Sequence, residues 1–278
     1  MIIRQILKDA AEKLKGVGVA DPLVDASLLL SHVTGRAPLL LRADSFSDLP
    51  PDQQTAFEKL LERRLAHEPL QYIIGTVEFM GLTLTVSPDA LIPRYDTEIL
   101  CEEALRRIES GMRVLDLCTG TGAIALTLKK HADCRVFASD ISEKALALAQ
   151  KNAQKNALAV DFRLGDLLAP FENEVFDMIV SNPPYISAAD MLTLSPEVLN
   201  EPHLALHGGE DGLHFYRRIA EAAPKHLIPG GWLLFEIGCD QGKAVAQLME
   251  KDFECVQVVQ DLAHLDRVVL GKKKVRPV

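Results

Sequence analysis

The sequence contains no C-x-x-C pair, no long uncharged apolar run and no excess of basic residues. Its five cysteines are odd in number and irregularly spaced, which argues against a disulfide framework and a zinc site. No segment approaches the roughly 18 apolar residues of a membrane helix. Lys8, Asp9 and Glu12 stand where a signal peptide would be apolar. These absences exclude a disulfide-bonded miniprotein and a membrane-spanning protein, and they predict a cytoplasmic location.

The net charge of −9 disfavours direct binding to nucleic acid, because phosphate groups are contacted by clustered lysine and arginine side chains. Residues 1–75 carry 9 basic and 10 acidic side chains, whereas residues 76–278 carry 21 and 29. The acidic excess therefore lies in the larger, carboxyl-terminal part of the chain. We expect no direct contact with nucleic acid and none with membranes.

The length of 278 residues favours two unequal domains. Up to about residue 68, apolar residues recur at three- and four-residue spacing, which predicts helices. Asp21-Pro22 is typical of a helix start, and the prolines within 48–52 mark another. Alternating polar and apolar residues over 72–92, around the turn at Met80-Gly81, predict a β-hairpin. We therefore predict a helical, substrate-docking domain over 1–71, a hairpin linker over 72–95 and a catalytic domain over 96–278.

Beyond residue 112, short β-rich apolar runs alternate with amphipathic stretches. This alternation predicts a parallel sheet that helices cover on both faces. No long helical pattern separates the last two strands, so we expect them to form an antiparallel hairpin at the sheet's edge. The predicted strands are 113–117, 135–140, 160–164, 176–181, 232–237, 255–259 and 267–270, and the predicted helices are 123–130, 143–156 and 242–251.

A glycine-rich turn follows the first predicted strand and precedes a helix; it consists of Cys118, Thr119, Gly120, Thr121 and Gly122. In open α/β sheets ligands bind at this edge. The glycines let the backbone approach a ligand closely, and the helix amino terminus offers N–H groups. The turn fails the dinucleotide pattern G-x-G-x-x-G, so by itself it predicts a ligand-binding edge without naming the ligand.

Two aspartates follow the next two predicted strands. Asp140 ends the second strand, where its carboxylate can accept hydrogen bonds from both hydroxyls of a ribose. The alternative is that Asp140 only caps the next helix together with Ser142. Asp166 follows the third strand, where it can meet an adenine amino group or simply form a turn. Both alternatives stay open for each aspartate.

The tetrapeptide Asn182-Pro183-Pro184-Tyr185 follows the fourth predicted strand. Two consecutive prolines give the chain a rigid exit from the strand, so the Asn182 side-chain oxygen and the Pro183 carbonyl can act as acceptors. A primary amide or amine has two N–H groups that need two acceptors. Held in this way, its nitrogen can face an electrophile while Tyr185 packs against the planar group.

With this tetrapeptide the sequence resembles class I S-adenosylmethionine-dependent methyltransferases that modify planar nitrogens. It is most similar to the family of protein-(glutamine-N5) methyltransferases of peptide chain release factors (PrmC/HemK), over almost its whole length. A sister family that acts on a ribosomal protein shares the tetrapeptide but differs around residues 92–98, so it is the less favoured alternative. The further segments that carry the resemblance are 68–73, 78–82, 91–98, 201–202, 208–213, 236–238 and 261–263.

The resemblance implies an α/β fold: a class I methyltransferase (Rossmann-like) sheet with an antiparallel last strand, preceded by a small all-α domain and a β-hairpin. It implies that the cofactor is S-adenosyl-L-methionine. The implied reaction methylates the side-chain amide nitrogen of a glutamine in the Gly-Gly-Gln loop of class I peptide chain release factors, which modulates translation termination. The enzyme is expected to be a monomer that uses no metal.

The resemblance also assigns roles to residues. The implied cofactor-binding residues are Cys118, Thr119, Gly120, Thr121, Gly122, Asp140, Asp166, Leu167 and Asn182. The implied catalytic and substrate-binding residues are Asn182, Pro183, Pro184 and Tyr185, and Arg94 is expected to border the substrate. The family usually has glycine, proline and glycine where this chain has Cys118, Tyr95 and His264. Cys118 is expected to narrow the pocket for the methionine end of the cofactor.

Two functions from other classes compete with this hypothesis. An adenine-N6 methyltransferase would present an exocyclic amine to the same two acceptors after base flipping, but it needs a basic groove or a recognition domain. A pseudo-methyltransferase adaptor would not need the intact Gly120, Asp140 and Asn182. His203 and His207 lie four residues apart without a third ligand at suitable spacing, so we expect surface histidines in a loop rather than a metal site.

Overall fold

The computed structural model describes residues 1–275, so the last three residues of the predicted catalytic domain, 276–278, lie outside the described part. The described residues fold into two compact units. The first unit comprises residues 1–76 together with 195–200, and the second comprises 77–194 and the chain from 201 onward. Within the described residues, no helix is long and apolar enough to cross a membrane.

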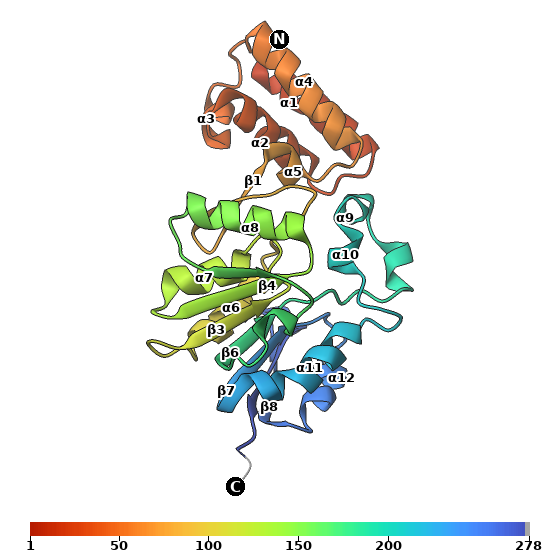
Figure 1. Cartoon of the computed structure of the whole chain (residues 1–278). Coiled ribbons are helices and arrows are strands. Elements are labelled where there is room, and N and C mark those ends of the chain that lie inside the picture. The colour runs from red at the N-terminus through yellow and green to blue at the C-terminus, as the bar shows by residue number, and fades with distance from the viewer. Residues whose placement is uncertain (276–278) are drawn as a thin grey trace. The chain divides into compact units, whose positions relative to one another are not determined.

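The first unit is helical, as the apolar spacing predicted. Pro22 occupies the first turn of its second helix, and Gly35, with a φ of 66°, ends that helix at the predicted position. Leu14, Leu29 and Leu30 are fully buried in the core that the helices share. The two short helices that follow Ala37 and Pro69 were not predicted. The helices are α1 (Ile3–Gly16), α2 (Pro22–Thr34), α3 (Pro38–Ala43), α4 (Pro51–Leu65), α5 (Leu70–Ile74) and α9 (Pro196–Leu199) (Figure 1).

A buried arginine joins α9 to the helices of the amino-terminal segment. The Arg64 side chain on α4 is 7% exposed and pairs with Asp25 of α2 at 2.7 Å and with Glu197 of α9 at 3.1 Å. Asn200, at the end of α9, donates a hydrogen bond to the His67 carbonyl at 3.1 Å. Removing one partner of such a buried pair leaves an uncompensated charge, which is strongly destabilising. The segment 195–200 is therefore an integral part of the first unit.

The second unit is built on a sheet which, within residues 1–275, has seven strands in the order β5-β4-β3-β6-β7-β9-β8. The strands from β3 to β7 pair in parallel, and β9 runs antiparallel to both β7 and β8. This confirms the predicted parallel sheet with an antiparallel last strand. The strands are β3 (Arg113–Leu117), β4 (Arg135–Asp140), β5 (Asp161–Leu164), β6 (Phe176–Ser181), β7 (Leu227–Glu236), β8 (Phe253–Gln260) and β9 (Asp266–Lys273).

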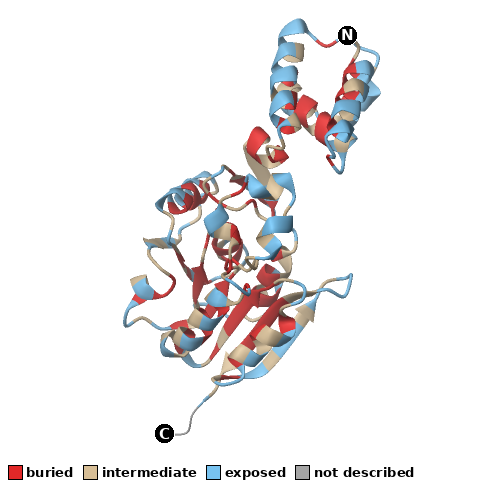
Figure 2. Ribbon diagram, turned by 90° about the vertical axis from the view of Figure 1, so that its right-hand side faces the viewer, coloured by how far each residue is buried: buried red, intermediate tan, exposed pale blue. Residues whose placement is uncertain are grey.

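Helices cover both faces of this sheet, as predicted (Figure 1). One face carries α6 (Thr97–Leu105), α7 (Ala123–His131), α8 (Glu143–Lys155) and the hairpin of β1 (Thr76–Phe79) and β2 (Leu82–Thr85). The other carries α11 (His214–His226) and α12 (Gly242–Met249). Alternate residues of one strand serve the two cores: Leu234 faces α6 and Phe235 faces α11. The central strands are accordingly buried, whereas the helices expose their outer sides (Figure 2).

Several elements differ from the sequence-based expectation. The hairpin begins later than residue 72 because residues 70–74 form α5. The longer helices α6 and α11 were not predicted. The loop expected around His203 and His207 instead forms α10 (His203–Leu206), with the two imidazole rings stacked 5.2 Å apart. The remaining short elements are the 3-10 turns η1 (Ala169–Phe171) and η2 (Asp190–Thr193).

Candidate active site

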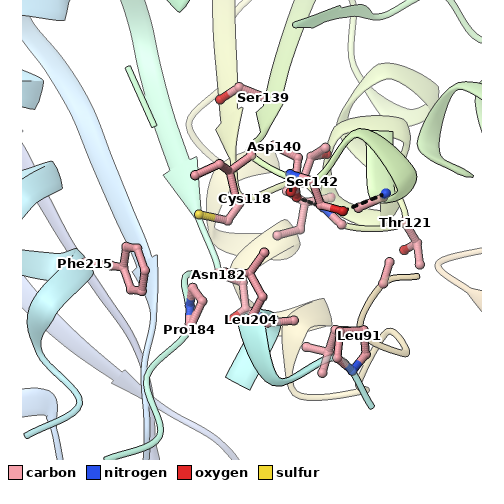
Figure 3. A pocket seen from close by; sticks show the side chains of 18 of the residues that line it. Leu91, Cys118, Thr121, Ser139, Asp140, Ser142, Asn182, Pro184, Leu204 and Phe215 are labelled. Atoms are coloured by element: carbon pink, nitrogen blue, oxygen red, sulfur yellow. Dashed lines mark hydrogen bonds between the residues drawn. The ribbon is translucent and has the colours of Figure 1, made fainter. Parts of the chain in front are cut away.

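A pocket of about 270 Å³ lies in the second unit at the carboxyl ends of the parallel strands. The order of the strands reverses between β3 and β6, which is where open α/β sheets bind ligands. Figure 3 shows Cys118, Asp140, Asn182 and Phe215 around this pocket, from the ends of β3, β4 and β6 and from α11. Sequence segments nearly 100 residues apart therefore contribute to one site.

The glycine-rich turn forms one side of the pocket. Gly120 and Gly122 have φ values of 55° and 81°, a left-handed backbone that favours glycine. The buried Asp116 carboxylate holds the turn from beneath, because its Oδ2 accepts hydrogen bonds from the Thr119 hydroxyl at 2.6 Å and from the Ala125 N–H at 3.2 Å. Burial raises the pKa of Asp116 to about 7. The turn thus presents the amino terminus of α7 to the pocket in a fixed conformation.

Asp140 connects this turn to the next helix. Its Oδ2 accepts a hydrogen bond from the Gly120 N–H at 2.9 Å, and its Oδ1 accepts one from the Ser142 N–H at 2.9 Å. Ser142 itself caps α8 by accepting a hydrogen bond from the Ala145 N–H at 3.2 Å. The helix-capping interpretation is therefore correct for Ser142, while the Asp140 carboxylate also lines the pocket. Burial raises the pKa of Asp140 above its ordinary value.

Asp166 and Leu167 line the pocket after β5. The Asp166 carboxylate pairs with the Arg218 guanidinium of α11 at 2.6 Å, and Arg218 also lines the pocket. Leu167 has a φ of 51° and is buried. Asp166 thus begins a turn, in which its carbonyl accepts a hydrogen bond from the Ala169 N–H, and its partly exposed carboxylate is also held by a specific partner.

The Asn-Pro-Pro-Tyr segment reaches the pocket through two of its four residues. Asn182 and Pro184 line the pocket, whereas Pro183 and Tyr185 are not among the lining residues. The Asn182 side-chain nitrogen, Nδ2, donates to the Thr97 hydroxyl at 3.5 Å. Tyr185 packs instead against the core beneath α11, and burial raises the pKa of its phenol. Its expected role as a wall for the substrate stays a prediction.

Arg94 lines the pocket, and its guanidinium is held by the Glu201 carboxylate; that it borders the substrate stays a prediction. The same carboxylate accepts a hydrogen bond from the Ile92 N–H at 3.0 Å. The Glu201 side chain is only 2% exposed. Glu201 thus fixes the segment around Arg94, a function that the sequence motif Glu201-Pro202 did not reveal.

An apolar wall of the pocket was missed at the level of sequence. It consists of Leu91, Leu204, Ala205 and Phe215, and Figure 3 shows three of these side chains around the cavity. The sequence feature that indicates this wall is the pair Gly208 and Gly212, because a side chain at either position would collide with the backbone of the Asn-Pro-Pro-Tyr segment. A Cβ on Gly208 would lie 2.7 Å from the Pro184 carbonyl oxygen, and one on Gly212 would lie 2.4 Å from the Tyr185 carbonyl oxygen. Glycine at these positions lets the segment 202–215 approach the Asn-Pro-Pro-Tyr segment closely.

Comparison with known proteins agrees with this geometry. Residues 5–75 match the family model of the PrmC N-terminal domain, and residues 95–265 match that of the methyltransferase small domain. A release factor glutamine methyltransferase from Geobacter sulfurreducens is 42% identical over 273 residues, which cover 97% of this chain and 96% of the relative. One from Cereibacter sphaeroides is 44% identical over 271 residues, or 96% of each chain. The chain belongs to the release factor glutamine methyltransferase family.

Solved structures support the fold of this family member. A methyltransferase from Pyrococcus furiosus matches with a TM-score of 0.56 and 20% identity, covering 70% of this chain and 90% of that one. The E. cuniculi Mtq2-Trm112 complex, which methylates the translation termination factor eRF1, matches with a TM-score of 0.50 and 22% identity, covering 67% and 99%. Both show that the second unit has a methyltransferase fold.

Proposed function

We propose that this enzyme transfers a methyl group from S-adenosyl-L-methionine to the side-chain amide nitrogen of a glutamine in a peptide chain release factor. Such a modification modulates translation termination. The observation that carries the proposal is that Asn182 lines the same pocket as Gly120 and Asp140. A hydrogen-bond acceptor for an amide thus lies beside a turn and a carboxylate suited to a nucleoside. Family membership, with relatives aligned over nearly the full length, supports the same reaction.

The residues of the pocket fit S-adenosyl-L-methionine. Burial removes water from the Asp140 carboxylate and so disfavours its ionised form. The hydroxyl groups of a ribose could donate the hydrogen bonds that water no longer provides. We propose that Asp140 binds the ribose, that Asp166 and Leu167 border the adenine, and that residues 118–122 accommodate the methionine end. When bound, the cofactor supplies a methyl group on a positively charged sulfur.

Asn182 and Pro183 would orient the substrate. A glutamine amide is a poor nucleophile because its nitrogen lone pair is delocalised into the carbonyl. The Asn182 Oδ1 and the Pro183 carbonyl oxygen can accept the two N–H groups of the amide and hold its nitrogen toward the methyl group. The amide proton would become acidic only after the methyl group has moved from sulfur to nitrogen, and it would then leave to water, so no general base is needed before transfer. Positioning and electrostatics therefore provide most of the catalysis.

We further propose that the substrates are class I release factors with a Gly-Gly-Gln loop and that the enzyme is a monomer that does not bind nucleic acid. Residues 1–71 would dock the release factor. This segment carries nearly balanced charge and contributes no residue to the pocket. The acidic character of residues 76–278 is unfavourable for a nucleic-acid groove.

Truncation tests the docking role. A truncated chain that begins near Glu68 should still bind S-adenosyl-L-methionine, because all the lining residues of the pocket lie within the second unit. It should methylate an intact release factor much more slowly than the full chain, because partner contact area is lost. A soluble truncated protein that methylates the release factor at the full-length rate would disprove docking by residues 1–71.

A further inference from the structure

Glu236 lies beside Asn182 because of the register of two neighbouring strands. Ser181 of β6 pairs with Phe235 of β7 in parallel register, so the residues that follow them, Asn182 and Glu236, sit side by side at the end of the sheet. Leu234 packs toward α6, and strand alternation turns Glu236 to the same face. The first residue of α6, Thr97, meets them there.

These three side chains form a polar group, the Asn182–Thr97–Glu236 cluster. Asn182 Nδ2 donates to the Thr97 hydroxyl at 3.5 Å, and both side chains lie close enough to the Glu236 carboxyl group to counteract the effect of burial on its pKa. Thr97 is 4% exposed and Glu236 is 2% exposed. One oxygen of Glu236, Oε2, is buried and has no hydrogen-bond partner anywhere in residues 1–275. An unpaired buried oxygen of this kind is unfavourable and calls for an explanation.

The chemistry of the cluster restricts how the Asn182 carboxamide can point. Above pH 7, where the Glu236 carboxyl group is ionised, it only accepts hydrogen bonds, whereas a carboxamide has a donor end and an acceptor end. The NH₂ end of Asn182 is therefore favoured next to Glu236, because the opposite orientation would place two buried oxygens against each other. The second N–H of Asn182 has Oε2 of Glu236 as an available acceptor. With its NH₂ group directed at the cluster, Asn182 turns Oδ1 toward the pocket.

We propose that Glu236, together with Thr97, is a positioning residue that fixes the orientation of the Asn182 carboxamide and so presents its Oδ1 to the substrate amide. Glu236 acts through Asn182, since Asn182 and Thr97 line the pocket but Glu236 does not. The long Nδ2 to Thr97 contact is expected to shorten when substrate occupies the site, as catalytic hydrogen bonds often do. This inference rests on the acceptor role proposed above for Asn182.

The substitution Glu236→Gln tests the proposal, because glutamine has the same shape but both donates and accepts and so no longer selects one orientation. At roughly pH 8.5, where Glu236 is ionised, we expect the single-turnover rate of methyl transfer to a purified release factor to fall roughly tenfold, with the Kd for S-adenosyl-L-methionine within about twofold of the wild-type value. Glu103→Gln is the matched control. Glu103 is an equally buried carboxylate on α6, paired with Arg106 and Arg107 outside the pocket, and its variant should keep the wild-type rate per cofactor-binding molecule.

A double-mutant cycle separates positioning through Asn182 from a general structural effect. If Glu236 acts through Asn182, then Glu236→Gln should change the rate little when Asn182 is already alanine. An equal loss in both backgrounds overturns the proposal, as does a wild-type rate in Glu236→Gln. A joint loss of rate and cofactor affinity would show that Glu236 is only structural.

A measurement without substrate keeps this test independent of the proposed reaction. In ¹⁵N-labelled protein, the side-chain NH₂ signals of Asn182 are identified by their absence in Asn182→Ala. We expect their exchange with solvent to be slow in the wild type and at least tenfold faster in Glu236→Gln, because a buried hydrogen bond is lost. Equal exchange in the two proteins refutes the positioning role even if no release factor is methylated. Slow exchange in the wild type together with an inactive wild-type enzyme would instead count against the proposed function alone.

Discussion

Replacing Asp140 by alanine should weaken binding of S-adenosyl-L-methionine without unfolding the protein. The substitution removes the acceptors that hold the Gly120 and Ser142 N–H groups at 2.9 Å, together with the proposed acceptors for the ribose. Ser142 still caps α8 through its own hydroxyl, so the helix should persist. A hydrogen bond to a charged group contributes about 1.5–3 kcal/mol. Net loss of one such bond to the cofactor corresponds to a roughly 10- to 150-fold higher Kd.

Isothermal titration calorimetry with S-adenosyl-L-methionine measures this effect directly. Asp140→Asn should fall between alanine and the wild type, because asparagine keeps one acceptor oxygen. Glu172→Ala is the matched control, since it removes one negative charge from an exposed position outside the pocket. Circular dichroism shows whether each variant is folded. A folded Asp140→Ala protein with wild-type affinity would remove Asp140 from the cofactor site and refute the reasoning.

Four further outcomes follow from the structure. Asn182→Ala should lower the single-turnover rate by about 100-fold or more in quenched-flow assays, as expected for loss of one preorganised polar group, and a near-normal rate would contradict the mechanism. Burial raises the pKa of Glu236 from 4.5 to about 7, with Asp96 and Arg267 as the facing charges, so the folded protein holds a proton that the unfolded chain releases between these pH values. The free energy of unfolding should therefore fall as pH rises through this window, by on the order of 2–3 kcal/mol from this group. Urea denaturation followed by Trp232 fluorescence should show a smaller fall for Glu236→Gln than for the wild type. The same pH dependence of stability in both proteins would contradict the raised pKa of Glu236. Cys118→Gly should bind S-adenosyl-L-methionine at least as tightly as the wild type, as measured by calorimetry. The substitution removes a side chain that lines the pocket, and the φ of 60° at this position favours glycine. Weaker binding would show that the thiol makes a favourable contact with the cofactor. Arg64→Met should destabilise the first unit by about 3–5 kcal/mol, because Asp25 and Glu197 lose their buried partner, while the affinity for the cofactor stays unchanged. An unchanged midpoint of thermal unfolding would show that these ion pairs contribute nothing to stability.

Local patterns in the sequence were sufficient to predict the framework of the site. Apolar runs predicted the strands that end at Leu117, Asp140 and Ser181, and the turn residues between them predicted where the pocket opens. The rule that parallel strands share one carboxyl edge then brought the turn, Asp140 and Asn182 together. The predicted helix start at Asp21-Pro22 and its end at Gly35 were confirmed for the same reason, since capping is a local property.

The missing parts depend on contacts between residues that are distant in the chain. Arg94 meets Glu201 107 positions later, and Glu197 meets Arg64 133 positions earlier. No spacing rule connects such pairs. Glu236 was recognised only as part of a family motif, because its neighbour Asn182 is set by strand register, which a single sequence does not specify. The helix α11, which supplies Phe215 to the pocket, follows directly after a glycine-rich segment and was not predicted.

Mass spectrometry of a purified release factor tests the central claim most directly. The factor is incubated with this enzyme and S-adenosyl-L-methionine, digested and sequenced by fragmentation. The account predicts a single added methyl group on the side-chain nitrogen of one glutamine, and its near absence with Asn182→Ala. An unmodified factor, or a methyl group on any other residue type, would contradict the account.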